Sequence, residues 1–183
     1  MALWMPILVA AVIVFVVSSI VHMMLPYHKS DYLPVPNQDQ VMAALRPFNL
    51  PAGDYMMPKP ASMADYKSPA FAEKMKEGPC AIMTVYTGHK HSMVGSLVQW
   101  FVYSIVVGTF AAYIAGRALG PGASYLTVFR FAGATAFLGY SAALVQSSIW
   151  MRRSWVTTLK GMFDGLLYGL LTAGTFGWLW PSA

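Results

Sequence analysis

Charged residues are scarce in this chain, at 10% of its 183 positions, whereas an ordinary soluble domain carries about 25%. Cysteine is nearly absent, and the single Cys80 excludes both an intrachain disulfide and a cluster of cysteine metal ligands. Common catalytic signatures are missing too: there is no phosphate-binding glycine-rich loop, no zinc-protease helix and no nucleophile elbow. The composition therefore excludes a surface that faces water throughout, and no familiar enzyme motif is present.

Long apolar runs account for the shortage of charge. They are Leu3–Leu25, Gly95–Leu119, Tyr125–Trp150 and Leu159–Trp180. Each is long enough for a helix to cross the hydrocarbon core of a bilayer, which takes about 20 residues. No positive charge precedes the first run, and it is longer than the apolar part of a signal peptide, so we expect a retained anchor. The runs predict an all-α membrane protein with four transmembrane helices, one N-terminal anchor at 1–25 and a three-helix C-terminal bundle at 95–183.

The segment 26–94 is the one stretch large enough to fold in water, and its pattern predicts a small α+β extramembrane insert between helices 1 and 2. Helices are expected at about 38–46 and 69–77, and strands at about 53–57 and 80–87. Asn37 and Ser68 are expected to cap the two helices. Because so few elements bury little apolar surface, the insert should lean on the bundle or on a partner chain.

Basic residues are distributed unevenly along the chain. Seven of the twelve lie in the insert, three more lie in the loop at 152–160, and the remaining two are Arg117 and Arg130. The positive-inside rule then predicts a cytoplasmic insert and periplasmic N- and C-termini. Topology and anionic lipid explain the net charge of +5, so nucleic acid is not an expected partner.

Small residues recur at four-residue spacing in two of the runs. The positions are Gly161, Gly165, Gly169, Ala173 and Gly177 in the last run, and Gly108, Ala112 and Gly116 in the second. Residues at this spacing share one face of a helix, and in lipid a face of small residues lets another helix approach closely. The pattern predicts helix contacts, either within this chain or with another subunit.

Asp164 is the only acid in any of the apolar runs. A carboxylate inside a membrane is costly unless it finds a partner. The polar groups expected at the same, inner end of the spans are His22, Gln99, Gln146, Ser147, Arg152 and Arg153. Arg130 lies near the opposite end and should reach outward to head groups rather than pair with Asp164. The cluster is open to three interpretations: a hydrogen-bonded knot that fixes packing, a binding or proton-handling site, or a subunit interface.

Histidine and methionine raise the question of metals. His22 and His28 flank Met23 and Met24, His89 and His91 form a second pair, and the chain has 13 methionines. Thioethers and imidazoles suit copper(I), but no ligand set repeats at a recognisable spacing, and methionine is a common filler of apolar helices. The sequence therefore predicts neither metal ligands nor a cofactor, with copper or haem as the alternative.

Several stretches resemble a family of small bacterial inner-membrane proteins with four predicted spans. They are Ser18–Tyr32, Glu77–Val85, Leu97–Phe101, Gly122–Arg130, Ser148–Met151 and Phe163–Pro181. The resemblance implies four spans and a location in the bacterial inner membrane. It supplies no catalytic residues, and the pair His89 and His91 lies outside these stretches.

These observations predict a non-catalytic integral membrane protein that works through helix contacts. The expected role is an accessory or scaffolding subunit of a larger membrane complex, or a homo-oligomer, with the lipid bilayer and other membrane subunits or itself as partners. The alternative is a small membrane carrier or a metal-handling protein, for copper or haem, that uses the inner polar cluster. A membrane enzyme is a third and weaker hypothesis.

Overall fold

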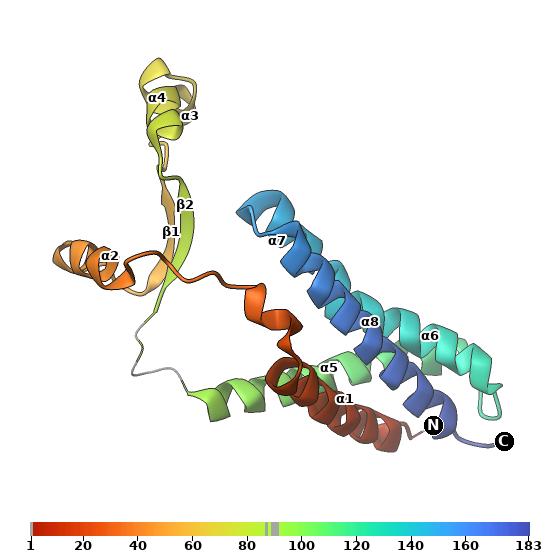
Figure 1. Cartoon of the computed structure of the whole chain (residues 1–183). Helices are drawn as coiled ribbons and strands as arrows, with labels where there is room; N and C mark the ends of the chain where they lie inside the picture. The colour runs from red at the N-terminus through yellow and green to blue at the C-terminus, as the bar shows by residue number, and fades with distance from the viewer. Residues whose placement is uncertain (1, 87, 89–91) are drawn as a thin grey trace. The chain divides into compact units, whose positions relative to one another are not determined.

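The computed structural model describes residues 2–86, 88 and 92–183, and these divide into two compact units (Figure 1). The helical unit comprises Met1–Tyr32 and Ser92–Ala183, and the smaller unit is Leu33–His91. The boundary after the first helix therefore lies at Tyr32, so that Pro26–Tyr32 belongs to the helices rather than to the insert.

The helical unit is built from long helices and short turns. Its elements are α1 (Trp4–Met24), the 3₁₀ turn η1 (Pro26–Ser30), α5 (Met93–Ala118), α6 (Tyr125–Phe137), the π-helical segment η4 (Leu138–Ala142), α7 (Leu144–Met151) and α8 (Trp155–Trp178). Within the described part of the chain, three helical segments are long and apolar enough to cross a membrane: α1, α5 and the continuous run Tyr125–Met151. The chain is accordingly compatible with a multi-pass membrane protein.

The helix α8 occupies the centre of the helical unit. It packs along α6 and against α1, which in turn packs on α5. Figure 1 shows α6 and α8 side by side, running in opposite directions. Phe176 of α8 is fully buried with Val128 and Ala132 of α6, and Tyr168 of α8 is buried with Val14 of α1. The core of the unit therefore forms around α8.

The small residues of α8 face α6 and η4 of the same chain. A Cβ atom added to Gly169 would lie 3.2 Å from the backbone of Phe137, and one added to Gly133 of α6 would lie 2.8 Å from the Cβ of Ala173. In the second run, Gly108 lies against Ile7 of α1. The glycine edge of α8 thus lets two helices of one chain approach closely.

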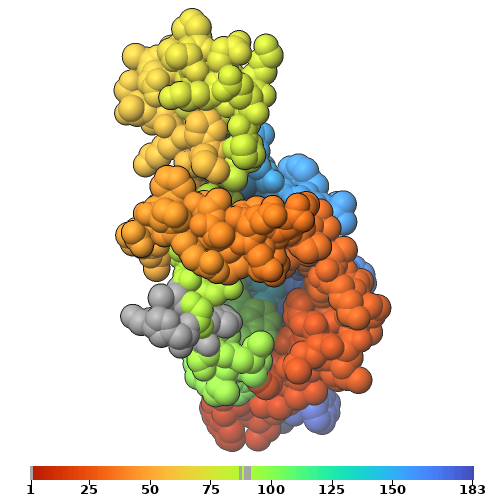
Figure 2. Space-filling view, turned by 60° about the vertical axis from the view of Figure 1, so that its left-hand side comes forward, coloured from red at the N-terminus to blue at the C-terminus, as the bar shows by residue number. Residues whose placement is uncertain are grey.

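The smaller unit holds short elements around a two-stranded sheet. They are α2 (Gln38–Leu45), the 3₁₀ turn η2 (Arg46–Phe48), β1 (Gly53–Met57), α3 (Met63–Tyr66), α4 (Pro69–Glu77) and β2 (Ala81–Val85). The strands pair antiparallel with Tyr55 opposite Met83, so both predicted strands are confirmed. Figure 2 shows α3 and α4 gathered in a small lobe, coloured yellow. Among the described residues of this unit, Phe71 is the one buried apolar side chain, so its core is as small as expected.

The two predicted caps have different outcomes. The hydroxyl of Ser68 accepts a hydrogen bond from the Phe71 N–H at 3.1 Å, which confirms the cap of α4. The cap at Asn37 is wrong, because Asn37 adopts a left-handed conformation with φ 50° and its side chain makes no capping hydrogen bond. Asparagine tolerates this region of backbone space, so a backbone turn begins α2 instead.

The close approach of α6 and α8 can be tested at glycine. We expect Gly133→Ala to lower the free energy of unfolding by about 1–3 kcal/mol, because its new methyl group would meet Ala173. The matched control is Gly174→Ala, whose added Cβ would lie 3.5 Å from the hydroxyl of Tyr125, an ordinary contact. That control should be neutral or stabilising by up to about 1 kcal/mol. Thermal unfolding in detergent, followed by circular dichroism, separates the two, and equal melting temperatures would contradict the packing.

Candidate functional site

A polar site lies where the end of α1 meets the first turns of α8. Leu25 is extended after α1, and Pro26 occupies the first position of η1, where its fixed φ suits a helical start. The turn η1 brings Tyr27 and His28 back towards α8. The helix α8 supplies Lys160 and Asp164, which are four residues apart and so share one face of that helix.

Asp164 is buried, with 3% of its surface exposed, and it has two partners from η1. The hydroxyl of Tyr27 donates a hydrogen bond to Oδ1 of Asp164. The Nε2 atom of His28 lies 2.9 Å from Oδ2 of Asp164. Oδ1 of Asp164 is therefore hydrogen-bonded, whereas Oδ2 of Asp164 and Nε2 of His28 are buried, face each other and have no hydrogen bond among the described residues.

His28 lies between two carboxylates. Its Nδ1 atom is 2.7 Å from Oδ2 of Asp31, and its Nε2 atom faces Asp164. Lys160 completes this arrangement, with Nζ donating to Oδ1 of Asp31 at 3.0 Å, to the hydroxyl of Ser30 at 2.8 Å and to the carbonyl oxygen of Tyr27. We call His28, Asp31, Lys160 and Asp164 the ionic cluster.

The charges around Asp31 favour its ionised form. Burial alone would raise the pKa of this carboxyl, but hydrogen bonds from His28 and Lys160, with their positive charges, hold the pKa below its ordinary value. The negative charge of Asp31 in turn orients the imidazole of His28 and the ammonium of Lys160.

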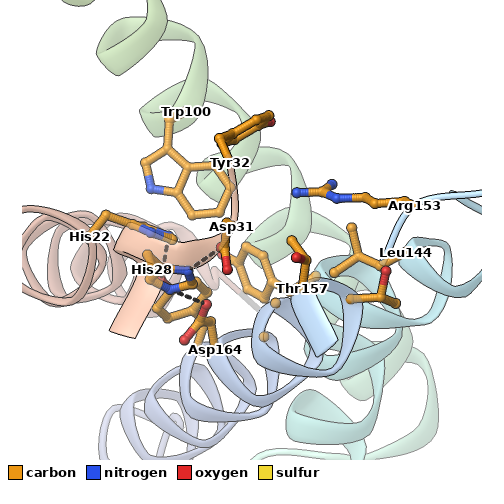
Figure 3. Close-up of a pocket in the computed structure, with 14 residues that line it drawn as sticks. His22, His28, Asp31, Tyr32, Trp100, Leu144, Arg153, Thr157 and Asp164 are labelled. Carbon is orange, nitrogen blue, oxygen red and sulfur yellow. Dashed lines mark hydrogen bonds and ion pairs between the residues drawn. The ribbon is translucent and has the colours of Figure 1, made fainter. Parts of the chain in front are cut away.

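A cavity of about 370 Å³ opens beside the ionic cluster. Its lining residues are His22, His28, Asp31, Tyr32, Trp100, Tyr140, Leu144, Arg153, Thr157, Thr158, Gly161, Asp164, Gly165 and Tyr168. Figure 3 shows the histidines and acids on one side of the cavity and Arg153 on the other. The cavity thus combines acidic, basic and aromatic groups from α1, η1, α5, η4, α8 and the loop between α7 and α8.

Aromatic rings close the inner part of the cavity. The rings of Trp100, Tyr140 and Tyr168 contact one another, with centroids 5.6 to 5.9 Å apart. Tyr140 comes from the π-helical segment η4, a local distortion of the kind that often lies at functional sites. Trp100 is held by a 2.7 Å hydrogen bond from its Nε1 to the hydroxyl of Ser18. These contacts hold these three aromatic rings of the cavity lining in place.

Three groups at the cavity could bind one metal ion. A donor atom from each of His22, His28 and Asp164 lies within 4.8 Å of the other two. The rings of His22 and His28 are 4.3 Å apart, and the hydroxyl of Tyr168 lies 3.4 Å from Nε2 of His22. Two imidazoles and a carboxylate are a donor set that first-row divalent metals accept.

Of the polar residues predicted to cluster, the cavity contains His22, Asp164 and Arg153. Gln99, Gln146, Ser147 and Arg152 are not among its lining residues. Arg130 and Asp164 form no ion pair among the described residues, as expected from their depths. His89 and His91 lie outside the described residues.

Most of the ionic cluster was not predicted from the sequence, and neither was Tyr27, which contacts it. Tyr27, His28 and Asp31 were assigned to the insert, and Lys160 was assigned to a loop. Two signals pointed towards it. One is Pro26 directly after an apolar helix, which indicates a turn, and the other is the spacing of His22 and His28 across that turn. Neither signal indicates that the turn folds onto α8.

Comparison with known proteins gives no family: no family model, no curated protein and no solved structure matches this chain.

The contacts of Lys160 generate a prediction about stability. We expect Lys160→Met to lower the free energy of unfolding by about 1.5–3 kcal/mol, because it leaves Asp31 without its ammonium partner and frees the carbonyl oxygen of Tyr27. Lys29→Met is the matched control, since Lys29 is exposed and lies in η1, the turn that also contains Tyr27. Thermal unfolding in detergent measures both variants. A control that loses as much stability as Lys160→Met would contradict the role of these contacts.

Proposed function

We propose that this chain is a non-catalytic integral membrane protein that binds a divalent transition-metal cation in the cavity beside the ionic cluster. Of the functions considered from the sequence, this is the carrier or metal-handling alternative. The observation that carries it is the convergence of His22, His28 and Asp164 from three separate elements on one cavity. A knot that served packing alone would not require the exposed His22.

The distances support binding of a small cation. Two ligands at about 2.1 Å from one metal ion, the usual length of a bond to zinc, lie about 3.4 Å apart at the tetrahedral angle and about 3 Å apart at about 90°. The Nε2 atom of His28 and Oδ2 of Asp164 are 2.9 Å apart. His28 and Asp164 could therefore hold a cation together, with His22 as the third ligand.

Asp31 supports this site by holding the ring of His28 in position. A histidine that binds a metal commonly directs its other ring nitrogen to a carboxylate, which fixes the orientation of the ring. His28 has this arrangement, with Nδ1 at 2.7 Å from Asp31 and Nε2 directed to Asp164. Lys160 in turn holds Asp31 in place.

The donor set favours zinc-like divalent ions over the copper(I) considered from the sequence. Copper(I) prefers sulfur ligands, and the residues that line the cavity include neither cysteine nor methionine. Haem also fits poorly, because two axial histidines lie on opposite faces of the porphyrin. The rings of His22 and His28 are only 4.3 Å apart, which leaves no space for a porphyrin between them.

The placement in the membrane is part of the proposal. With 24 residues, α8 is long enough to cross a bilayer as a fourth span. Its lower apolarity comes from the small residues that face α6 and η4 and from Lys160 and Asp164. The cavity would then lie at the end of the spans that carries Arg152 and Arg153, which the positive-inside rule assigns to the cytoplasmic side of a bacterial inner membrane.

A role as an accessory subunit or homo-oligomer stays a prediction. Its main support was the glycine edge of α8, and that edge lies against α6 within the chain. A partner subunit would have to use another face, such as the exposed side of α5. Metal binding and assembly are compatible, because they would use different surfaces.

Metal binding can be measured on the full chain, purified with a tag that contains no histidine and stripped with a chelator. We expect one cobalt(II) or zinc(II) ion per chain, with visible absorption bands for bound cobalt. His22→Ala and Asp164→Asn should each weaken binding at least about tenfold, because each removes a ligand. The readouts are a calorimetric titration and the cobalt spectrum.

The matched control is the double variant His89→Ala with His91→Ala, which removes the two histidines that are not proposed as ligands. It should bind metal as the unchanged protein does. Retained affinity in both His22→Ala and Asp164→Asn, with melting temperatures showing that they are folded, would contradict the proposal. Loss of affinity in the double variant alone would place the site elsewhere.

The proposed topology predicts the locations of reporters fused in a bacterial host. Alkaline phosphatase, which is active only in the periplasm, should be active when fused after Ala183 and inactive when fused after Arg153. A fluorescent protein that matures only in the cytoplasm should give the opposite pattern. Equal behaviour at the two positions would show that α8 does not cross the membrane.

A further inference from the structure

Arg130 is a second charged group among the apolar helices, and it lies apart from the ionic cluster. It is the sixth residue of α6 and is exposed at the surface of the helical unit. Within residues 2–86, 88 and 92–183, no carboxylate forms an ion pair with its guanidinium. An arginine at this depth is costly unless it meets an anion or reaches the head groups.

An apolar groove of about 430 Å³ runs beside Arg130 on the surface formed by α6 and α8. It is lined by Phe129, Arg130, Gly133, Ala134, Phe137, Leu166, Gly169 and Leu170. Gly133 and Gly169 line the groove where α6 and α8 approach each other closely. Arg130 is therefore the one charged residue among those that line this apolar groove.

We propose that this groove binds an anionic phospholipid, with the phosphate paired to Arg130 and an acyl chain lying along Ala134, Leu166 and Leu170. The guanidinium group pairs with phosphate through two parallel hydrogen bonds. The groove and the cation together match the two halves of a phospholipid. The site is separate from the metal site and does not depend on it.

The depth of Arg130 fits a lipid phosphate. At a rise of 1.5 Å per residue, Arg130 lies about 8 Å along the axis from the start of α6 at Tyr125. A long arginine side chain can cover that distance to the membrane interface while its methylene groups stay in contact with apolar surface. A helix of another protein would need an acid at the same depth, whereas lipid supplies the phosphate at the interface.

The test measures lipids that stay bound to the full-length protein extracted from nanodiscs of equimolar phosphatidylglycerol and phosphatidylcholine. Native mass spectrometry counts the bound lipids of each kind. We expect phosphatidylglycerol to be retained in preference to phosphatidylcholine. Arg130→Gln should reduce this preference about tenfold, because the loss of a paired charge removes the interaction with the phosphate.

Three further variants make the result specific. Arg117→Gln, which removes another exposed arginine near the end of α5, should keep the preference. Arg130→Lys should keep part of it, because it retains the charge but loses the paired hydrogen bonds. Ala134→Leu should lower the retention of both lipids by filling the groove. Melting temperatures identify any variant that fails to fold.

The outcomes separate the proposal from simple attraction to a charged surface. Equal loss in Arg117→Gln and Arg130→Gln would overturn the site, since it would indicate non-specific attraction. An unchanged preference in Arg130→Gln, or full retention of both lipids in Ala134→Leu, would overturn it as well. Metal binding should be unaffected in all four variants, so that the two proposals fail or stand independently.

Discussion

The buried carboxylate of Asp164 is the constraint on which the polar end of this molecule depends. A carboxyl group among apolar helices is costly unless it finds partners. Tyr27 and His28 provide them, and they can do so only because the chain turns sharply at Pro26 and returns to α8. Asp31 and Lys160 then satisfy the remaining groups of that turn. One buried carboxyl group thus organises the end of α1, the turn η1 and the start of α8.

The helix α8 is not among the three most apolar segments of the unit, and it carries small residues where it meets α6 and η4. Helices that face lipid need large apolar side chains over most of their surface, as α1 does with its valines and isoleucines. A helix surrounded by protein needs close contact, which glycine and alanine permit. Gly165, Gly169 and Ala173 provide that contact against α6 and η4. Because small residues take the place of large apolar ones along this face, the mean hydropathy of α8 is lower than that of the three candidate spans.

Some residues of the site could be predicted from the sequence, and others could not. Depth along a span can be counted from the sequence, which led us to expect His22, Asp164 and Arg153 at one end, and these three line one cavity. The direction in which a turn folds cannot be counted in this way. His28 and Asp31 were therefore missed as partners of Asp164, although the spacing of His22 and His28 had raised the question of a metal.

The amino-acid sequence by itself determined the local elements: long apolar runs form helices, alternating residues at 53–57 and 81–85 form strands, and Ser68 caps α4. These features depend on neighbours within a few positions, whose periodicity and hydrogen bonds are written in the chain. Only the tertiary structure decided that the glycine edge of α8 packs on α6, and that His22, His28 and Asp164 converge on one cavity. Those contacts join α8 to segments that lie far from it in the sequence, and their geometry arises when the helices pack against one another.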